Sequence, residues 1–204
     1  MRKTKEEAAL TRQKILNAAR RAFHKNGVAK TSLERIAAEA GLTRGAIYWH
    51  FKDKTTLFFA MQEDVSATID QRLEKVLFSP KWKNPLDAIA QMLKTFFYIL
   101  QEETAARQIF EIMVLKCEYV GEFENVIETL MQPAHNLLKN LTDFYQKARE
   151  LHLLRDDIPP RELAIDTAIY VNGLVYYLAS QEIRRWEPNV EKLIDSHIAL
   201  RRKS

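Results

Sequence analysis

The chain has few residues that interrupt helices and only one cysteine. Five glycines and six prolines are few for 204 residues, and strand-favouring residues do not collect into alternating runs bounded by turn pairs. The single cysteine, Cys117, excludes an internal disulfide and any multi-cysteine zinc or iron–sulfur site, and fits either a small buried residue or a redox-sensitive thiol. The five histidines show no metal-ligand spacing. We expect an all-α protein with no metal and no cofactor.

The sequence also lacks a long uninterrupted apolar run. It opens with the charged segment Met1–Glu7, which is unlike a signal peptide. The most apolar stretch, Leu163–Ala179, contains Asp166 and Asn172, and polar residues at bilayer depth are costly. We therefore expect a cytoplasmic protein without a membrane-spanning helix.

Positive charge is concentrated in the first quarter of the chain. Residues 1–54 contain thirteen Lys or Arg and five Asp or Glu, a net charge of +8, whereas residues 55–204 have a net charge of −4. Clustered cations favour nucleic acid because binding releases counterions; a merely solvated basic surface is the alternative. We predict a DNA-binding domain over residues 1–54 and a second domain over residues 55–204.

Apolar residues recur at helical spacing over most of the chain, and capping residues mark the helix starts. Thr31 and Glu34 have capping-box spacing, and Asn84 followed by Pro85 is typical of a helix start. Thr43 and Asp53 can each cap a further helix. Pro133 predicts a kink or a break. The nine expected helices lie at about residues 5–26, 31–40, 43–50, 53–73, 84–100, 104–117, 121–151, 161–181 and from 187 onward.

A short part of the basic segment meets the steric requirements of a helix-turn-helix. Ala37 is small where the two helices would cross, and Gly41 tolerates the positive φ of the turn. Ile36, Leu42 and Ile47 supply apolar anchors on both sides. An ordinary pair of packed helices is the alternative. The coincidence of these requirements favours the DNA-binding motif.

The expected second helix of the motif has an inward and an outward face. Ile47 and Phe51 are four residues apart and point inward. The N-terminus of such a helix enters the major groove, so Arg44 is suited to the paired acceptors of guanine, and Tyr48 to a thymine methyl group or a phosphate. Gly45 permits close approach of the backbone.

Other residues of the basic segment are placed to contact phosphates, which set register without reading sequence. These are Thr31, Ser32, His50 and Lys54. The predicted DNA-contacting residues are Thr31, Ser32, Thr43, Arg44, Gly45, Tyr48, Trp49, His50 and Lys54.

Leu33–Ala37 and Gly41–Lys54 together resemble the TetR family of bacterial transcriptional regulators. Arg2–Lys5 and Leu115–Glu122 resemble its AcrR, TtgR and MtrR subgroup, which represses multidrug efflux pumps and so affects antibiotic resistance. The resemblance implies a homodimeric repressor of a palindromic operator, released when a small, often hydrophobic molecule binds the second domain and respaces the two DNA-binding heads. It implies no enzyme, and the sequence has no nucleophile elbow, phosphate-binding glycine loop or metal cluster.

In this family the last two helices form a four-helix interface with the partner subunit. A mid-helix glycine such as Gly173 costs about 1 kcal/mol unless it permits close approach, which independently favours a dimer. The predicted interface residues are Ile165, Ile169 and Gly173.

The expected ligand site rests on aromatic and polarisable residues, which also populate ordinary cores. Asn172 is polar within an apolar helix and is a ligand contact, a satisfied buried amide or a dimer contact. Gln62 stands where efflux-pump repressors often have a bulky aromatic or acidic residue, so ligand identity is not implied. The predicted ligand contacts are Phe59, Gln62, Met92, Phe96, Phe110, Met113, Tyr170, Asn172 and Tyr176.

The alternative function is a DNA-binding regulator of the same fold without a small-molecule effector, acting as an activator or an architectural factor. A panel of ligands that never changes melting temperature or operator affinity would favour that alternative. The sequence also leaves open whether induction moves the heads as rigid bodies or orders them.

Overall fold

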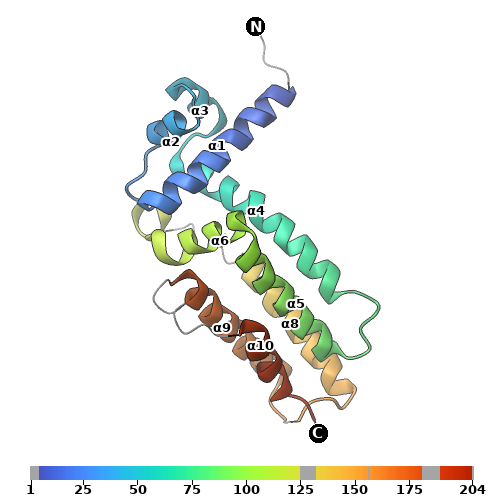
Figure 1. Ribbon diagram of the computed structural model, residues 1–204. Coiled ribbons are helices and arrows are strands. Elements are labelled where there is room, and N and C mark those ends of the chain that lie inside the picture. Colours follow the sequence, from blue (N-terminus) through green and yellow to red (C-terminus); the bar gives the residue numbers. More distant parts are fainter. Residues whose placement is uncertain (1–4, 125–131, 156, 181–188, 204) are drawn as a thin grey trace. The chain divides into compact units, whose positions relative to one another are not determined.

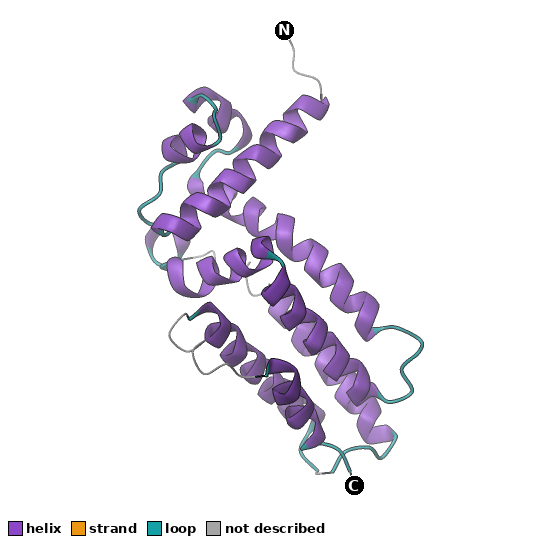
Figure 2. Cartoon of the chain, viewed as in Figure 1, coloured by secondary structure: helices purple, strands orange, loops and turns teal. Residues whose placement is uncertain are grey.

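The computed structural model of the chain describes residues 5–124, 132–155, 157–180 and 189–203. Within these ranges the regular elements are nine α-helices, one π turn and one 3-10 turn (Figures 1 and 2). The all-α prediction is confirmed. The chain forms two compact units, one from residues 1–67 and 104–129 and the other from residues 68–103 and 130–204. The functional boundary predicted after Lys54 is a different division and stays a prediction.

The first unit combines the N-terminal helices with a later segment of the chain. Its helices are α1 (Lys5–Asn26), α2 (Leu33–Glu39), α3 (Arg44–His50), the first part of α4 (Lys54–Leu77) and α6 (Thr104–Glu111). Phe23, Ile36, Ile47 and Phe58 are fully buried where these helices meet. The ring of Phe58 lies 6.0 Å from that of Phe23 and 5.4 Å from that of Phe123. The helix-turn-helix therefore shares its core with residues more than fifty positions later.

Polar contacts also join α1 and the loop after it to the later segment of the same unit. Arg20 Nε donates to Gln108 Oε1 at 3.1 Å, His24 Nε2 lies 2.5 Å from Glu111 Oε2, and the Val28 amide donates to the Lys116 carbonyl at 3.0 Å. Side-chain and backbone groups both contribute, so α6 and the turn after it are attached to α1 at several points.

The second unit is a helical bundle built around α5. Its helices are the end of α4, α5 (Pro85–Glu102), α8 (Gln132–Glu150), α9 (Pro160–Ala179) and α10 (Val190–Ala199). Helix α5 packs against α8 and α10, and α8 packs against α9 (Figure 1). Ile89, Phe97, Leu141 and Ile194 are fully buried among them. Periodic apolar residues on each helix thus supply this core.

Three predicted helix starts are confirmed by their hydrogen bonds. The Asn84 side chain accepts from the Leu86 amide at 2.9 Å, with Pro85 in the first turn. The Thr43 hydroxyl accepts from the Ala46 amide, and Asp53 Oδ1 accepts from the Thr56 amide. Each cap satisfies an amide that has no partner within its own helix.

The capping box predicted at Thr31 is wrong by one residue. Ser32 caps α2, because its Oγ accepts from the Arg35 amide at 3.2 Å. The Thr31 side chain is instead buried, and its hydroxyl donates to the Gly27 carbonyl at 2.7 Å. Helix α2 begins one residue later than the capping box requires, so Ser32 stands at the cap position and the Thr31 hydroxyl faces the preceding turn.

The predicted helix over residues 104–117 changes its winding partway. Helix α6 ends at Glu111, and residues Ile112–Lys116 form a π turn. Cys117 follows, half-buried, and burial raises the pKa of its thiol to about 11. A protonated thiol is a poor nucleophile, which favours the packing role over the redox role.

The expected helix over residues 121–151 is only partly as predicted. Gly121–Phe123 form a 3-10 turn with a positive φ at Gly121, and α8 runs over Gln132–Glu150. Pro133 stands in the first described turn of α8, where proline is tolerated. Four parts of the predictions lie outside the described residues. They are residues 125–131, the basic tip at residues 2–4, the end of the helix predicted to residue 181 and the helix start predicted at residues 187–188.

A buried polar chain connects three helices of the second unit. The Tyr145 hydroxyl on α8 lies 2.7 Å from the Thr167 hydroxyl on α9, which lies 3.2 Å from His197 Nε2 on α10. The His197 ring stacks on Tyr170 with centroids 3.9 Å apart. Burial, assisted by the nearby Arg201 guanidinium, lowers the pKa of His197 to about 4.

We expect this histidine to make stability depend on pH. The unfolded chain takes up a proton near pH 6.5, whereas the folded chain resists it until about pH 4, so the free energy of unfolding falls as pH falls through this window. The loss is on the order of 3 kcal/mol, from about 1.4 kcal/mol for each pKa unit between about 4 and 6.5. Urea unfolding of His197→Gln between pH 4 and 6.5 should give a shallower pH dependence than the native chain, while His135→Gln, which changes an exposed histidine, should keep the native slope.

Candidate nucleic-acid interface

The turn between α2 and α3 has the geometry that a helix-turn-helix requires. Gly41 adopts a φ of +68°, and the Leu42 amide donates to the Ala37 carbonyl at 2.8 Å. Ile47 and Phe51 are buried, as predicted. The positive φ at Gly41 turns the chain within two residues, and Thr43 then starts α3.

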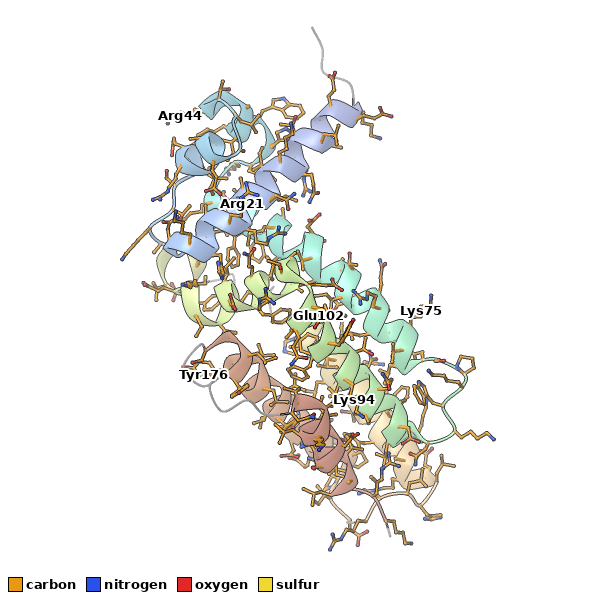
Figure 3. The ribbon with its side chains drawn as sticks, viewed as in Figure 1. Arg21, Arg44, Lys75, Lys94, Glu102 and Tyr176 are labelled. Carbon is orange, nitrogen blue, oxygen red and sulfur yellow. The ribbon has the colours of Figure 1, made fainter. Side chains whose placement is uncertain are left out.

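The opposite face of α3 is open to solvent. The Arg44 side chain, labelled in Figure 3, lies on the outer surface of the motif, and it is 74% exposed. Trp49 is 71% exposed, and Tyr48 beside it is also exposed. The Trp49 ring rests edge-on against His50, with centroids 4.5 Å apart. Large aromatic and basic side chains on one exposed helical face are typical of a binding surface.

Glu34 on α2 contacts two of these side chains. The Tyr48 hydroxyl donates to Glu34 Oε1 at 2.9 Å, and Arg44 Nε lies 3.3 Å from the same oxygen. The Arg44 guanidinium also lies over the Tyr48 ring, 5.5 Å from its centroid. A hydrogen bond from its own backbone amide, followed by the one from Tyr48, lowers the pKa of Glu34.

A hollow of about 460 Å³ opens beside α3. Its lining includes four predicted DNA contacts, Thr31, Ser32, Tyr48 and Lys54, and two lysines that sequence analysis missed, Lys30 and Lys52. Both lysines are exposed and flank the motif in the sequence. The concentration of positive charge over residues 1–54 was the signal that could have identified them.

The side chains predicted to contact phosphates differ in their availability. Ser32 is exposed, whereas Thr31 is buried and directs its hydroxyl to Gly27. His50 and Lys54 are half-buried, and Lys54 Nζ donates to the Val28 carbonyl at 3.2 Å. The Thr31 hydroxyl is thus committed to the fold, and Lys54 would contact DNA from a partly anchored position.

The predicted dimer residues lie on one face of α9. Ile169 is 65% exposed and Ile165 is half-buried. Apart from the neighbouring residues and backbone of α9 itself, no described atom lies within 4 Å of the position where a Cβ at Gly173 would stand. Tyr176 is exposed on the same helix (Figure 3). The opposite face of α9 is buried. Among the described residues of one chain, therefore, nothing uses the close approach that Gly173 permits.

The predicted ligand contacts are distributed over both compact units. Those in the first unit are Phe59, Gln62, Phe110 and Met113, and those in the second are Met92, Phe96, Tyr170, Asn172 and Tyr176. Gln62 is buried and donates to Ser66 Oγ at 2.8 Å. The Tyr170 ring stacks on the His197 ring, so one face of Tyr170 is covered within the chain.

Asn172 is exposed in the chain, and its Nδ2 donates to the Ala168 carbonyl at 3.0 Å. The satisfied buried amide, one of the three expected roles for this residue, is therefore wrong. A ligand contact and a dimer contact stay open. Its place on the same face as Ile169 and Gly173 favours the dimer contact.

The described residues lack the features of two other kinds of site. Among those residues there is no group of three or more His, Cys, Asp or Glu that could hold a metal ion. Over the same residues, no helix has both the length and the apolar character needed to cross a membrane.

A helix-turn-helix with an exposed basic and aromatic second helix defines a DNA-binding regulator of transcription. Residues 15–61 match the tetR family of bacterial regulatory proteins, and residues 84–201 match the C-terminal region of MAATS-type transcriptional repressors. The chain belongs to the TetR family, a family of transcriptional regulators and not of enzymes. The family membership predicted from the sequence is confirmed.

Relatives and solved structures agree with this assignment. The chain is 33% identical to the transcriptional regulator TtgR of Pseudomonas putida over 100% of this chain and 97% of the relative, and 37% identical to AcrR of Shigella flexneri over 85% and 80%. It is similar to the complex of SmeT with triclosan, with a TM-score of 0.81 and 30% identity over 96% of this chain and 93% of that one. NalD of Pseudomonas aeruginosa, a repressor of the MexAB-OprM multidrug efflux pump, gives a TM-score of 0.81 at 26% identity over 98% and 100%.

Proposed function

We propose that this chain is a repressor that binds a palindromic operator as a homodimer and is released by a small hydrophobic, drug-like molecule. Residues 1–54 form the DNA-binding head, and residues 55–204 carry ligand binding and dimerisation. The regulated genes encode a multidrug efflux pump. The single observation that carries the proposal is the exposed face of α3, where Arg44, Tyr48 and Trp49 stand beside a basic hollow.

In the DNA complex, α3 enters the major groove and the other contacts fix its register. Arg44 reads guanine through its paired donors, Thr43 contacts a base edge, and Gly45 lets the backbone approach. Ser32, His50 and Lys54 hold phosphates, joined by Lys30 and Lys52 of the hollow. Trp49 is exposed enough to pack against the sugar-phosphate backbone.

The homodimer forms through the open face of α9. Ile165, Ile169 and Gly173 lie on that face with Asn172, and an exposed apolar residue beside an unhindered glycine suits close helix packing. Two heads joined in this way would occupy successive major grooves, about 34 Å apart. The symmetry of the dimer is the physical reason to expect a palindrome.

Likeness to relatives supports the proposed class of inducer. SmeT is known in complex with triclosan, and both SmeT and NalD are named as repressors of multidrug efflux pumps. We propose an inducer of the same hydrophobic class for this chain. Its contacts come from the predicted aromatic and polarisable residues, of which Phe59, Phe96, Phe110 and Met113 are half-buried.

Genome-wide mapping of bound sites in the source bacterium would yield the operator for a direct test with triclosan as the probe. At a hundred times its dissociation constant, a ligand that binds the folded chain should stabilise it by about 2.7 kcal/mol. Operator affinity should fall by roughly 5- to 150-fold, which corresponds to a coupling free energy of about 1–3 kcal/mol. Fluorescence anisotropy and thermal melting measure the two effects.

An inducible repressor would be contradicted if neither triclosan nor any of a panel of hydrophobic antimicrobials stabilised the chain or lowered its operator affinity. That result would leave a regulator of the same fold that acts without an effector. Stabilisation without loss of operator affinity would show that ligand binding and DNA binding are not coupled.

A further inference from the structure

The carboxylate of Glu34 is the centre of a closed set of contacts on the DNA-binding surface. Its Oε1 accepts the Tyr48 hydroxyl proton and faces Arg44 Nε, and the Arg44 guanidinium covers the Tyr48 ring. Arg44 and Tyr48 are four residues apart on α3, whereas Glu34 reaches them from α2. The three groups therefore restrain one another across the two helices of the motif.

Stability is not a sufficient reason for this arrangement. The side chains of Arg44 and Glu34 are 74% and 43% exposed, and exposed ion pairs contribute little to folding because water screens them. What the contacts do is limit the conformations of two long side chains that would otherwise be free. Restraint before binding reduces the entropy lost when DNA is contacted.

The atoms used for these contacts decide what is left for DNA. Arg44 faces Glu34 through Nε, and a guanidinium held at Nε can present its two terminal nitrogens end-on to the paired acceptors of guanine. Tyr48 has one hydroxyl proton, and it donates this proton in the hydrogen bond to Glu34. A phosphate oxygen only accepts hydrogen bonds, so Tyr48 cannot donate to a phosphate while it donates to Glu34.

We propose that Glu34 is a positioning residue that sets sequence specificity: it holds Arg44 for guanine and withholds the Tyr48 hydroxyl from the phosphates. Tyr48 is thereby directed to an apolar base contact such as a thymine methyl group. The carboxylate also places a negative charge near the DNA backbone, which weakens binding to every sequence alike. This inference rests on the proposed roles of Arg44 and Tyr48 in DNA binding.

The test compares the mapped operator with a scrambled duplex of equal length and composition, using the full chain and fluorescence anisotropy at several salt concentrations. Glu34→Ala should bind the scrambled duplex about tenfold more tightly and bring the two affinities closer together. The lost negative charge should steepen the dependence of log affinity on log salt, whereas the freed hydroxyl is neutral, releases no counterion and should add affinity that does not depend on salt.

Two further variants separate the hydroxyl from the charge. Glu34→Gln keeps an oxygen that can accept from Tyr48, so it should retain most of the discrimination that Glu34→Ala loses. If Glu34→Ala folds poorly, Glu34→Gln still tests the effect of the lost negative charge. Glu39→Gln is the matched control, because Glu39 is an acidic residue of the same helix that pairs with Arg21 at 3.1 Å and contacts neither Arg44 nor Tyr48. It should leave the ratio of the two affinities at its native value.

Tyr48→Phe, made in the native and in the Glu34→Ala background, tests the coupling directly. Removal of the hydroxyl should cost several-fold more affinity for the scrambled duplex when Glu34 is absent. Equal costs in both backgrounds would overturn the inference, as would an equal fall of both affinities in Glu34→Ala. If Arg44→Ala leaves operator binding intact, the proposed reading surface itself is wrong, and that result is distinguishable from any behaviour of the Glu34 variants.

Discussion

Arg44→Ala is expected to abolish operator binding while the chain stays folded and dimeric. A bidentate arginine contact to guanine discriminates by about 1–3 kcal/mol, and a homodimer makes the contact twice. Affinity should therefore fall by roughly 30-fold to 20,000-fold, whereas the fold should be unaffected because the side chain is 74% exposed. Anisotropy with the mapped operator measures the loss, and circular dichroism with light scattering checks the fold and the dimer.

The matched control for this variant is Arg155→Ala. It removes an exposed arginine of the second unit and the same positive charge, so it separates the loss of a specific contact from the loss of net charge. Sequence-specific affinity that survives in Arg44→Ala would rule out Arg44 as the base-reading residue.

Ile169→Glu is expected to convert the dimer into monomers. Ile169 is 65% exposed in a single chain, so folding should tolerate the change, but a dimer through this face would bury two unpaired carboxylates. Loss of the second head removes the advantage of linked binding, which is worth about 100-fold to 10,000-fold in operator affinity. Light scattering measures the mass, and anisotropy measures the affinity.

Leu151→Glu provides the comparison for the dimer test. Leu151 is also an exposed apolar residue of the second unit, but it lies outside the predicted interface. This variant should remain dimeric. A dimer that persists in Ile169→Glu would place the interface elsewhere, and a monomeric Leu151→Glu would show that the charge acts indirectly.

Local signals in the sequence predicted the helices well. Thr43, Asp53 and Asn84 cap the helices they were expected to cap, because each acts on an amide two or three residues away. The positive φ of Gly41 was also predicted, since a tight turn between two apolar segments leaves few alternatives to it. Burial of Ile47 and Phe51 followed from their spacing alone.

Features that depend on partners distant in the chain could not be predicted. Thr31 and Ser32 are both good capping residues, and the residue at which α2 begins decides between them. The contact of Glu34 with Tyr48 depends on how α2 and α3 cross. The capping-box spacing to Thr31 assigned Glu34 a capping role and gave no indication of its contact with Tyr48.

The contacts between α1 and the segment around α6 constrain how hybrid regulators can be assembled from this chain. A graft that exchanges only the first 54 residues would leave Gln108, Glu111 and the Lys116 carbonyl facing a foreign α1, and would remove the Phe58–Phe123 pair from its native surroundings. Each mismatch would leave a polar group unsatisfied or a cavity in the shared core. The transplantable piece is thus discontinuous: the N-terminal helices together with the residues from Thr104 to Phe123 that complete their packing.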